Sequence, residues 1–202
     1  MKYGLDLSEN NDYTLKNPIA WDIIQDSKFT DFVILRRGFG VSAEEDSNYL
    51  EYYNKAKSIG IDDISSYWFS YALDPDEARQ EAYNYLDMTN NDNLALNRMI
   101  LDLEMNSKFQ RNGISKLTSN FVNGQMKAFL KVLIDHGMNV AIYSSQWVFE
   151  DLYDMEWIED NNVAIWNACY GNKDYIKGWM WQYTESEYIR DLGPFDANIK
   201  YE

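Results

Sequence analysis

The sequence predicts an α/β fold: an irregular TIM-like barrel in which five strand-helix units are followed by about three further strands. Apolar segments of strand length alternate with segments of helical periodicity along most of the 202 residues, and this alternation is typical of a parallel sheet. The main alternative is a doubly wound open sheet, but no glycine-rich phosphate loop follows the first strand of either half. The number of strands therefore favours a closed barrel that lacks its last helices.

The first half of the chain contains three predicted strands, over residues 3–7, 32–35 and 64–69, each rich in apolar or aromatic side chains. Polar residues 9–12 follow the first strand and predict a loop. Residues 36–40 follow the second strand, and their two glycines predict a turn.

Helix signals separate these strands. Pro18 is expected to open a short helix that continues through Ile24. A second helix is predicted over residues 47–59, because its apolar side chains keep helical spacing and a glycine follows it. Asp74 and Pro75 predict the start of a third helix, with Asp as the cap and Pro at the first helical position.

The second half begins with a fourth predicted strand, residues 99–104, which carries Asp102 and Glu104. The later elements are predicted from the spacing of apolar side chains and from a glycine that follows a helix. They are a long helix over 118–136, a strand over 140–143, a short helical segment over 148–153, and strands over 163–166 and 180–183. Residues 167–177 show no helical stripe. Asp196, in the segment 195–199, is expected to end the last strand.

Composition limits the function. We expect one domain over residues 1–202, because a chain of this length with 46% hydrophobic residues can bury a large core. The 18 basic and 33 acidic residues give a formal net charge of −15, which disfavours a nucleic-acid partner. Cys169 and His136 are the only residues of their types, so we expect no disulfide, no metal site and no Cys/His nucleophile.

The N-terminal residues lack the apolar core of a secretion signal, and no apolar run is long enough to span a bilayer. We therefore expect synthesis in the cytoplasm without a signal peptide and no membrane insertion. If the protein acts outside the cell, something else must release it.

Asp102 and Glu104 form the most informative pair of residues. Side chains two positions apart in a strand point to the same face, so each carboxyl makes the other harder to ionise and at least one pKa should rise. Such a pair can supply a proton donor and an anionic partner, as cleavage of a glycosidic bond requires. The alternative is a solvated face, because acid-x-acid spacing is common.

A barrel would bring other polar residues to the same place, because active sites of barrel enzymes lie at the C-terminal ends of the strands. Asp6 ends the first predicted strand and Gln182 ends a late one. With Asp196, four carboxyls from three strands would converge on one rim. The alternative for Asp6 and Asp196 is a helix or turn cap.

Aromatic side chains also occur at or near these strand ends. Tyr67, Tyr143 and Trp166 are candidate platforms for sugar rings, because flat aromatic faces pack well on them. The alternative is that they only fill the barrel interior or pack under helices.

Seven segments carry a resemblance to a known family in the expected order: 3–8 (Y-G-L-D-L-S), 32–40, 67–72, 100–104 (I-L-D-L-E), 142–145, 180–184 and 195–198. Together they cover nearly the whole chain. The sequence resembles glycoside hydrolase family 25, the lysozyme family of many bacteriophage endolysins and some bacterial autolysins. The resemblance implies the same barrel of five strand-helix units plus three strands.

The resemblance implies an N-acetylmuramidase that cuts the β-1,4 bond between N-acetylmuramic acid and N-acetylglucosamine in peptidoglycan. Glu104 matches the proton donor, and Asp102 matches the acid that orients the substrate's 2-acetamido group as that group attacks the anomeric carbon, which gives retention. Asp6 and Asp196 match acids that line the same site, and in a direct-displacement mechanism Asp6 could be the nucleophile or base instead. The resemblance also implies that no metal or cofactor is needed. The partners would be peptidoglycan glycan strands, reached after holin-dependent release or lysis, and we assume a monomer.

Two segments depart from the family pattern. Residues 9–13 replace the usual aromatic-Gln-Gly pattern after the first strand, and residues 106–116 do not align well. Two other functions stay open: a cell-wall binding module that does not cut peptidoglycan, and a glycosidase that acts on another amino-sugar polymer such as chitin.

Overall fold

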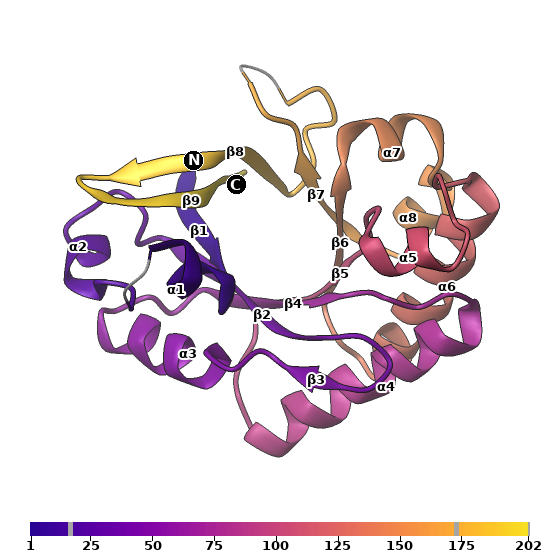
Figure 1. The fold of residues 1–202 in the computed structure, drawn as a ribbon, viewed down its shortest axis with the longest axis horizontal. Helices are drawn as coiled ribbons and strands as arrows, with labels where there is room; N and C mark the ends of the chain where they lie inside the picture. Colours follow the sequence, from indigo (N-terminus) through magenta and orange to yellow (C-terminus); the bar gives the residue numbers. More distant parts are fainter. Residues whose placement is uncertain (16–17, 172–173, 202) are drawn as a thin grey trace.

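Eight strands close into a barrel in the computed structural model, which describes residues 1–15, 18–171 and 174–201 (Figure 1). Within this part of the chain, a ninth short strand lies outside the ring and pairs with β2. The strands are β1 (Lys2–Leu7), β2 (Phe32–Phe39), β3 (Glu44–Glu45, outside the ring), β4 (Ile64–Phe69), β5 (Met99–Asp102), β6 (Val140–Ser145), β7 (Ala164–Ala168), β8 (Met180–Ile189) and β9 (Leu192–Lys200).

Most neighbouring strands in the ring are parallel, as the alternation of strands and helices predicts. Strand β9 is the exception, because it runs antiparallel to both β8 and β1 and closes the ring between them. Its register places Asp196 directly opposite Asp6. The expectation that Asp196 ends its strand is therefore wrong: Asp196 lies inside β9 and reaches the strand end of β1 because β9 is reversed.

Helices cover the outer face of the barrel along one side, and the long helices α4 and α6 lie next to each other there (Figure 1). The helices are α1 (Asn10–Leu15), α2 (Trp21–Gln25), α3 (Tyr49–Ser58), α4 (Pro75–Asp92), α5 (Ser107–Arg111), α6 (Ser119–Asp135), α7 (Gln146–Asp151) and α8 (Met155–Asp160).

The long helices begin at capping residues. The Asp74 carboxylate accepts hydrogen bonds from the backbone N–H groups of Asp76 and Glu77, which α4 would otherwise leave unpaired. The Thr118 hydroxyl does the same for the N–H of Phe121 at the start of α6. Helix α6 ends just before Gly137, whose φ of +76° suits a glycine.

The core has two layers because strand residues alternate in direction. On β4, Trp68 points outward and stacks on Tyr85 of α4 with ring centroids 5.5 Å apart. Its neighbour Tyr67 points into the barrel. The barrel interior is filled by a separate cluster of buried side chains: Phe32, Ile34, Tyr67, Ile100, Ala141, Tyr143, Trp166 and Met180. The floor of the barrel is thus packed rather than open.

Two local predictions are wrong. Residues 9–12 were expected to form a loop, but α1 begins at Asn10, because the Ser8 hydroxyl accepts a hydrogen bond from the Asn10 N–H and caps this turn. Residues 36–40 were expected to form a turn, but β2 continues to Phe39 through a bulge between Arg36 and Gly38. The elements β3, α5 and α8 were not predicted.

No helix in the described part of the chain has the length and apolar character needed to cross a membrane.

We predict that Leu133→Ala lowers the free energy of unfolding by about 2–5 kcal/mol, because Leu133 of α6 is fully buried and its removal leaves a cavity. Leu50→Ala on α3 is the matched control, since 42% of Leu50 is exposed, and its effect should stay within about 0.5 kcal/mol. Urea denaturation measures both values. Equal losses for the two variants would contradict this description of the core.

Candidate active site

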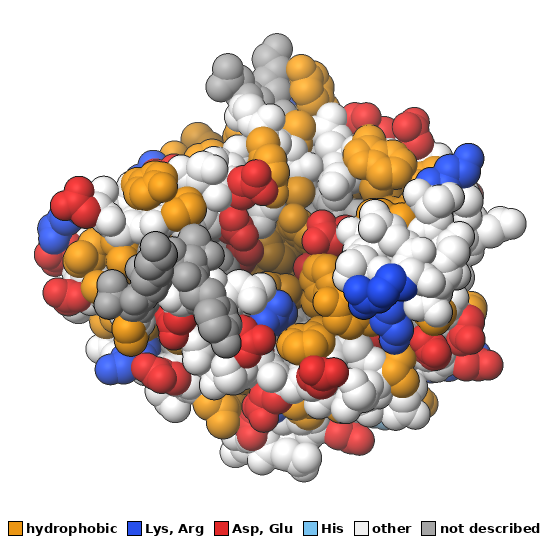
Figure 2. All heavy atoms as spheres, in the orientation of Figure 1, with side chains coloured by type: hydrophobic (Ala, Val, Ile, Leu, Met, Phe, Trp, Pro, Cys, Tyr) orange, Lys and Arg blue, Asp and Glu red, His pale blue; other side chains and the backbone are white. Residues whose placement is uncertain are grey.

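A cleft with a volume of about 390 Å³ opens at the end of the barrel where the parallel strands finish. Figure 2 shows this hollow at the centre of one face, with acidic side chains around it. The cleft brings together all eight side chains that the sequence singled out: Asp6, Asp102, Glu104, Asp196, Tyr67, Tyr143, Trp166 and Gln182.

Asp6 at the end of β1 lies in a network of side-chain hydrogen bonds. Its Oδ2 accepts from the amide of Gln182 at 3.0 Å and from the amide of Asn198 at 2.6 Å. The Gln182 Oε1 in turn accepts from the Tyr143 hydroxyl at 2.9 Å, and the Asn198 Oδ1 accepts from the Trp166 indole at 2.8 Å. These bonds hold the Asp6 carboxyl in one orientation. Asn198 was not singled out from the sequence, because an amide in a strand carries no distinctive spacing.

Asp196 shares a proton-binding site with Asp6. Burial raises the pKa of both carboxyls, and the negative charge of Asp6 raises that of Asp196 further, to about 8. Asp196 is therefore protonated at neutral pH and its hydroxyl donates a hydrogen bond to Asp6. The reversed direction of β9 creates this pair.

Asp102 is a buried carboxyl at the end of β5, and its Oδ1 has no hydrogen-bond partner among the described residues. Burial raises its pKa well above the usual range, and the charges of Glu104 and Asp6 add to this effect. A buried acceptor without a partner is costly, and Asp102 lines the cleft, so its carboxyl is suited to accept a hydrogen bond from a ligand.

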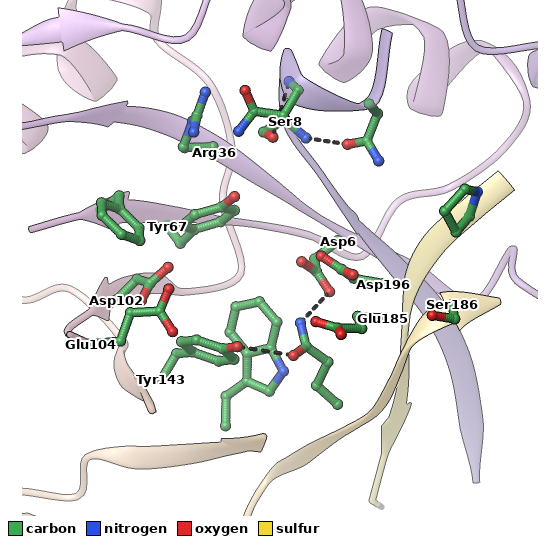
Figure 3. Close-up of a pocket in the computed structure, with 16 residues that line it drawn as sticks. Asp6, Ser8, Arg36, Tyr67, Asp102, Glu104, Tyr143, Glu185, Ser186 and Asp196 are labelled. Carbon is green, nitrogen blue, oxygen red and sulfur yellow. Dashed lines mark hydrogen bonds between the residues drawn. The ribbon is translucent and has the colours of Figure 1, made fainter. Parts of the chain in front are cut away.

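Glu104 lies just beyond β5 and stays partly exposed to the cleft, next to Asp102 in Figure 3. Burial raises the pKa of its carboxyl, and the charges of Asp6 and Glu185 raise it further. A carboxyl that has a raised pKa and faces a cleft is suited to act as a general acid.

Arg36 of β2 is the only Lys or Arg among the described residues that line the cleft. Its Nε donates to Asp46 at 2.8 Å and its Nη2 donates to Glu9 at 3.0 Å. The carboxylate of Asp46 is itself buried and accepts hydrogen bonds from the backbone N–H of Glu9. Sequence reasoning missed Arg36 because the following glycine made residues 36–40 resemble a turn.

The three aromatic candidates form one cluster of edge-to-face and tilted rings on the floor of the cleft. Trp166 lies between Tyr67 and Tyr143, with ring centroids 6.1 and 4.5 Å apart respectively. Only 1% of Trp166 is exposed, whereas Tyr67 and Tyr143 expose 9% and 8%. Both tyrosine edges therefore offer more surface to a ligand than the indole does.

The extended hairpin of β8 and β9 forms one wall of the cleft with Glu185, Ser186 and Pro194. Sequence reasoning missed these residues. The pairing of β8 with β9 shifts register between Gln182 and Thr184 and again after Thr184, so the alternation of inward and outward side chains does not continue along β8.

A metal ion has no evident place here. Among the residues that the structure describes, no group of three or more His, Cys, Asp or Glu side chains has the arrangement of a metal site.

The raised pKa of Asp196 predicts a pH-dependent loss of stability. The folded protein binds this proton up to about pH 8 while the unfolded chain releases it near the usual value of 3.8, so the free energy of unfolding falls as pH rises between these values. Asn cannot titrate, so Asp196→Asn should gain stability relative to the wild type from about pH 4 to about pH 8. Asp191→Asn, an exposed residue between β8 and β9, is the control. Denaturant unfolding at the lower and the higher pH value measures the free energy of unfolding of the wild type and both variants. The difference from the wild type should be the same at both pH values for Asp191→Asn and should change with pH for Asp196→Asn.

Three solved structures resemble this one over the whole chain. The autolysin LytC from Streptococcus pneumoniae, solved with a synthetic peptidoglycan ligand, has a TM-score of 0.79 and 21% identity, over 99% of this chain and 46% of that chain. The CTP1L endolysin has a TM-score of 0.78 and 19% identity, over 100% and 67% respectively. A family 25 glycosyl hydrolase from Bacillus anthracis has a TM-score of 0.75 and 19% identity, over 100% and 89%. The chain thus spans less than half the length of LytC, and these likenesses establish a shared fold.

The sequence itself matches a family. No curated protein sequence matches the chain, but the family described as Glycosyl hydrolases family 25 matches residues 6–192. This range begins at Asp6, near the end of β1, covers Asp102, Glu104 and all of β8, and ends at the first residue of β9. The chain therefore belongs to the glycosyl hydrolases of family 25 and is a glycoside hydrolase.

Proposed function

We propose that the protein is a lysozyme that hydrolyses the β-1,4 bond between N-acetylmuramic acid and N-acetylglucosamine in peptidoglycan. The observation that carries this proposal is the pair at the end of β5: a cleft-facing Glu104 with a raised pKa beside a buried Asp102 with an orphaned oxygen. Membership of family 25 supports hydrolysis over mere binding of the wall, and LytC was solved with a synthetic peptidoglycan ligand.

Glu104 is the proposed general acid. It would donate its proton to the glycosidic oxygen as the bond breaks, so that the leaving sugar departs as a neutral alcohol. Its raised pKa supports this role, because the group must still hold a proton at the working pH.

Asp102 is the proposed partner of the substrate's 2-acetamido group. Its orphaned Oδ1 would accept a hydrogen bond from the acetamido N–H while the acetamido oxygen attacks the anomeric carbon. As positive charge develops on this group, the adjacent carboxyl stabilises it. Two displacements at the same carbon would give retention of configuration.

Asp6 and Asp196 are proposed to stabilise the positive charge that develops on the sugar. Two amides and the Asp196 hydroxyl already bond the Asp6 carboxylate, and such bonds reduce its strength as a nucleophile. This arrangement favours an electrostatic role over direct displacement by Asp6. Tyr67, Tyr143, Trp166 and Gln182 are proposed to contact the sugars along the floor.

We predict that Glu104→Gln lowers the rate of peptidoglycan hydrolysis by about 10²–10⁴-fold, because the amide cannot donate the required proton. Purified Gram-positive peptidoglycan would be digested, reduced with borohydride and analysed for the labelled sugar. New ends should be on N-acetylmuramic acid. Glu51→Gln, an exposed residue of α3, should keep wild-type activity.

Other outcomes of this digestion would reject parts of the proposal. Reducing ends on N-acetylglucosamine would mean a glucosaminidase. If Glu104→Gln hydrolysed peptidoglycan at the wild-type rate, Glu104 could not be the general acid. If the enzyme released no reducing ends from peptidoglycan but hydrolysed chitin, its substrate would be another amino-sugar polymer.

The proposed role of Asp102 predicts the stereochemistry of the first product. Substrate assistance should release the β-anomer first, visible by proton NMR within the first minutes before mutarotation. Asp102→Asn should lower the rate without changing this anomer, since the acetamido oxygen remains the nucleophile. Initial release of the α-anomer would instead indicate direct attack by water.

A further inference from the structure

We propose that Glu185, with the ring of Tyr170, recognises a primary ammonium group of the substrate at the open edge of the cleft. This inference rests on the proposed function and specifies a feature of the wall glycan or its peptides that the enzyme favours.

Glu185 is placed in the cleft by the irregular part of β8. The register of β8 against β9 shifts on both sides of Thr184, and Glu185 lines the cleft although it belongs to the hairpin that extends beyond the barrel. Figure 3 shows its carboxyl near Asp6 and Asp196. The side chain is exposed, and within the described chain no hydrogen bond or ion pair engages its carboxylate.

The cleft cannot neutralise this carboxylate. Its other described acids are Asp6, Asp102, Glu104 and Asp196, and its one guanidinium is already paired with Glu9 and Asp46. An anionic group that approaches the hairpin wall therefore meets repulsion, and a cationic group finds an unpaired partner. Solvent exposure keeps the cost of desolvating such a pair small.

Tyr170 supplies a second feature that suits a cation. About half of this side chain is exposed, and its hydroxyl donates a hydrogen bond to the Gln182 Oε1 at 3.0 Å, which fixes the ring at the cleft edge. Gln182 and Glu185 both belong to β8 and both line the cleft, so this hydrogen bond places the Tyr170 ring against the strand that carries the Glu185 carboxylate. An aromatic face beside a carboxylate binds alkylammonium groups well.

Peptidoglycan offers a primary ammonium from two sources. One is a glucosamine residue that has lost its N-acetyl group, and the other is the free side-chain amine of a diamino acid in an uncrosslinked stem peptide. The chemistry of Glu185 and Tyr170 fits either source, so the experiment must separate them.

The test compares hydrolysis of native walls with walls whose amines have been capped by acetic anhydride. At low wall concentration, the wild-type enzyme should release reducing ends roughly two- to fivefold faster from native than from capped walls, as for an exposed ion pair. Glu185→Gln should reduce this ratio to about one, Glu185→Asp should restore part of it, and Tyr170→Leu should lower it. Asp191→Asn, which removes an equal charge from the same hairpin, should keep the wild-type ratio.

Glycan strands freed of stem peptides by an amidase identify the source. If the enzyme still hydrolyses native strands faster than capped strands, it recognises the amine of the sugar. If this preference disappears, it recognises the amine of the stem peptide. An equal ratio for the wild type and Glu185→Gln, with both enzymes active, would overturn the inference and leave the proposed function intact. No hydrolysis of any wall by the wild type would overturn both.

Discussion

The contact between the Asp6 carboxylate and the amides of Gln182 and Asn198 is the constraint on which the cleft depends. A carboxyl buried at the end of β1 is costly unless donors surround it, and here the donors come from β8 and β9. The same amide side chains accept hydrogen bonds from Tyr143 of β6 and Trp166 of β7, the next strands along the ring. The hydrogen bonds that orient the Asp6 carboxylate therefore also hold the ring closed. If the barrel opened between β1 and β9, this buried carboxylate would lose its hydrogen-bond donors.

Sequence periodicity was enough to predict the strands and long helices, because burial on one face and capping are local properties. Asp74 and Thr118 cap the helices that their positions indicate. The reversal of β9 was not predictable in this way, since an alternating or apolar strand reads the same in either direction. The bulge at Arg36 was hidden for a related reason: Gly38 signals a turn as readily as an irregular strand.

Asp6, Asp102 and Glu104 could be found from the sequence because each lies at or near a strand end or carries the acid-x-acid spacing. Asp196 was singled out on the wrong ground of ending its strand, and Glu185 was missed. What could not be found is their electrostatic environment. Burial and the facing charge of Asp6 on β1 raise the pKa of Asp196. Burial and the charges of Asp6 and Glu185 raise the pKa of Glu104, and the irregular register of β8 brings Glu185 to the cleft. The charges that act on each carboxyl belong to residues far apart in sequence, so local spacing patterns could not predict these pKa shifts.

The antiparallel pairing of β1 with β9 also sets Lys2 opposite Lys200, at the far end of these strands from Asp6 and Asp196. The first and last strands thus resemble a hairpin without its connecting turn. A short peptide joining them would leave every strand in its register, and the backbone could then be cut at an exposed loop elsewhere to give a circular permutant. Any protein fused at either strand would sit at the base of the barrel, so the end that carries the cleft would remain free in immobilised or tandem forms of the enzyme.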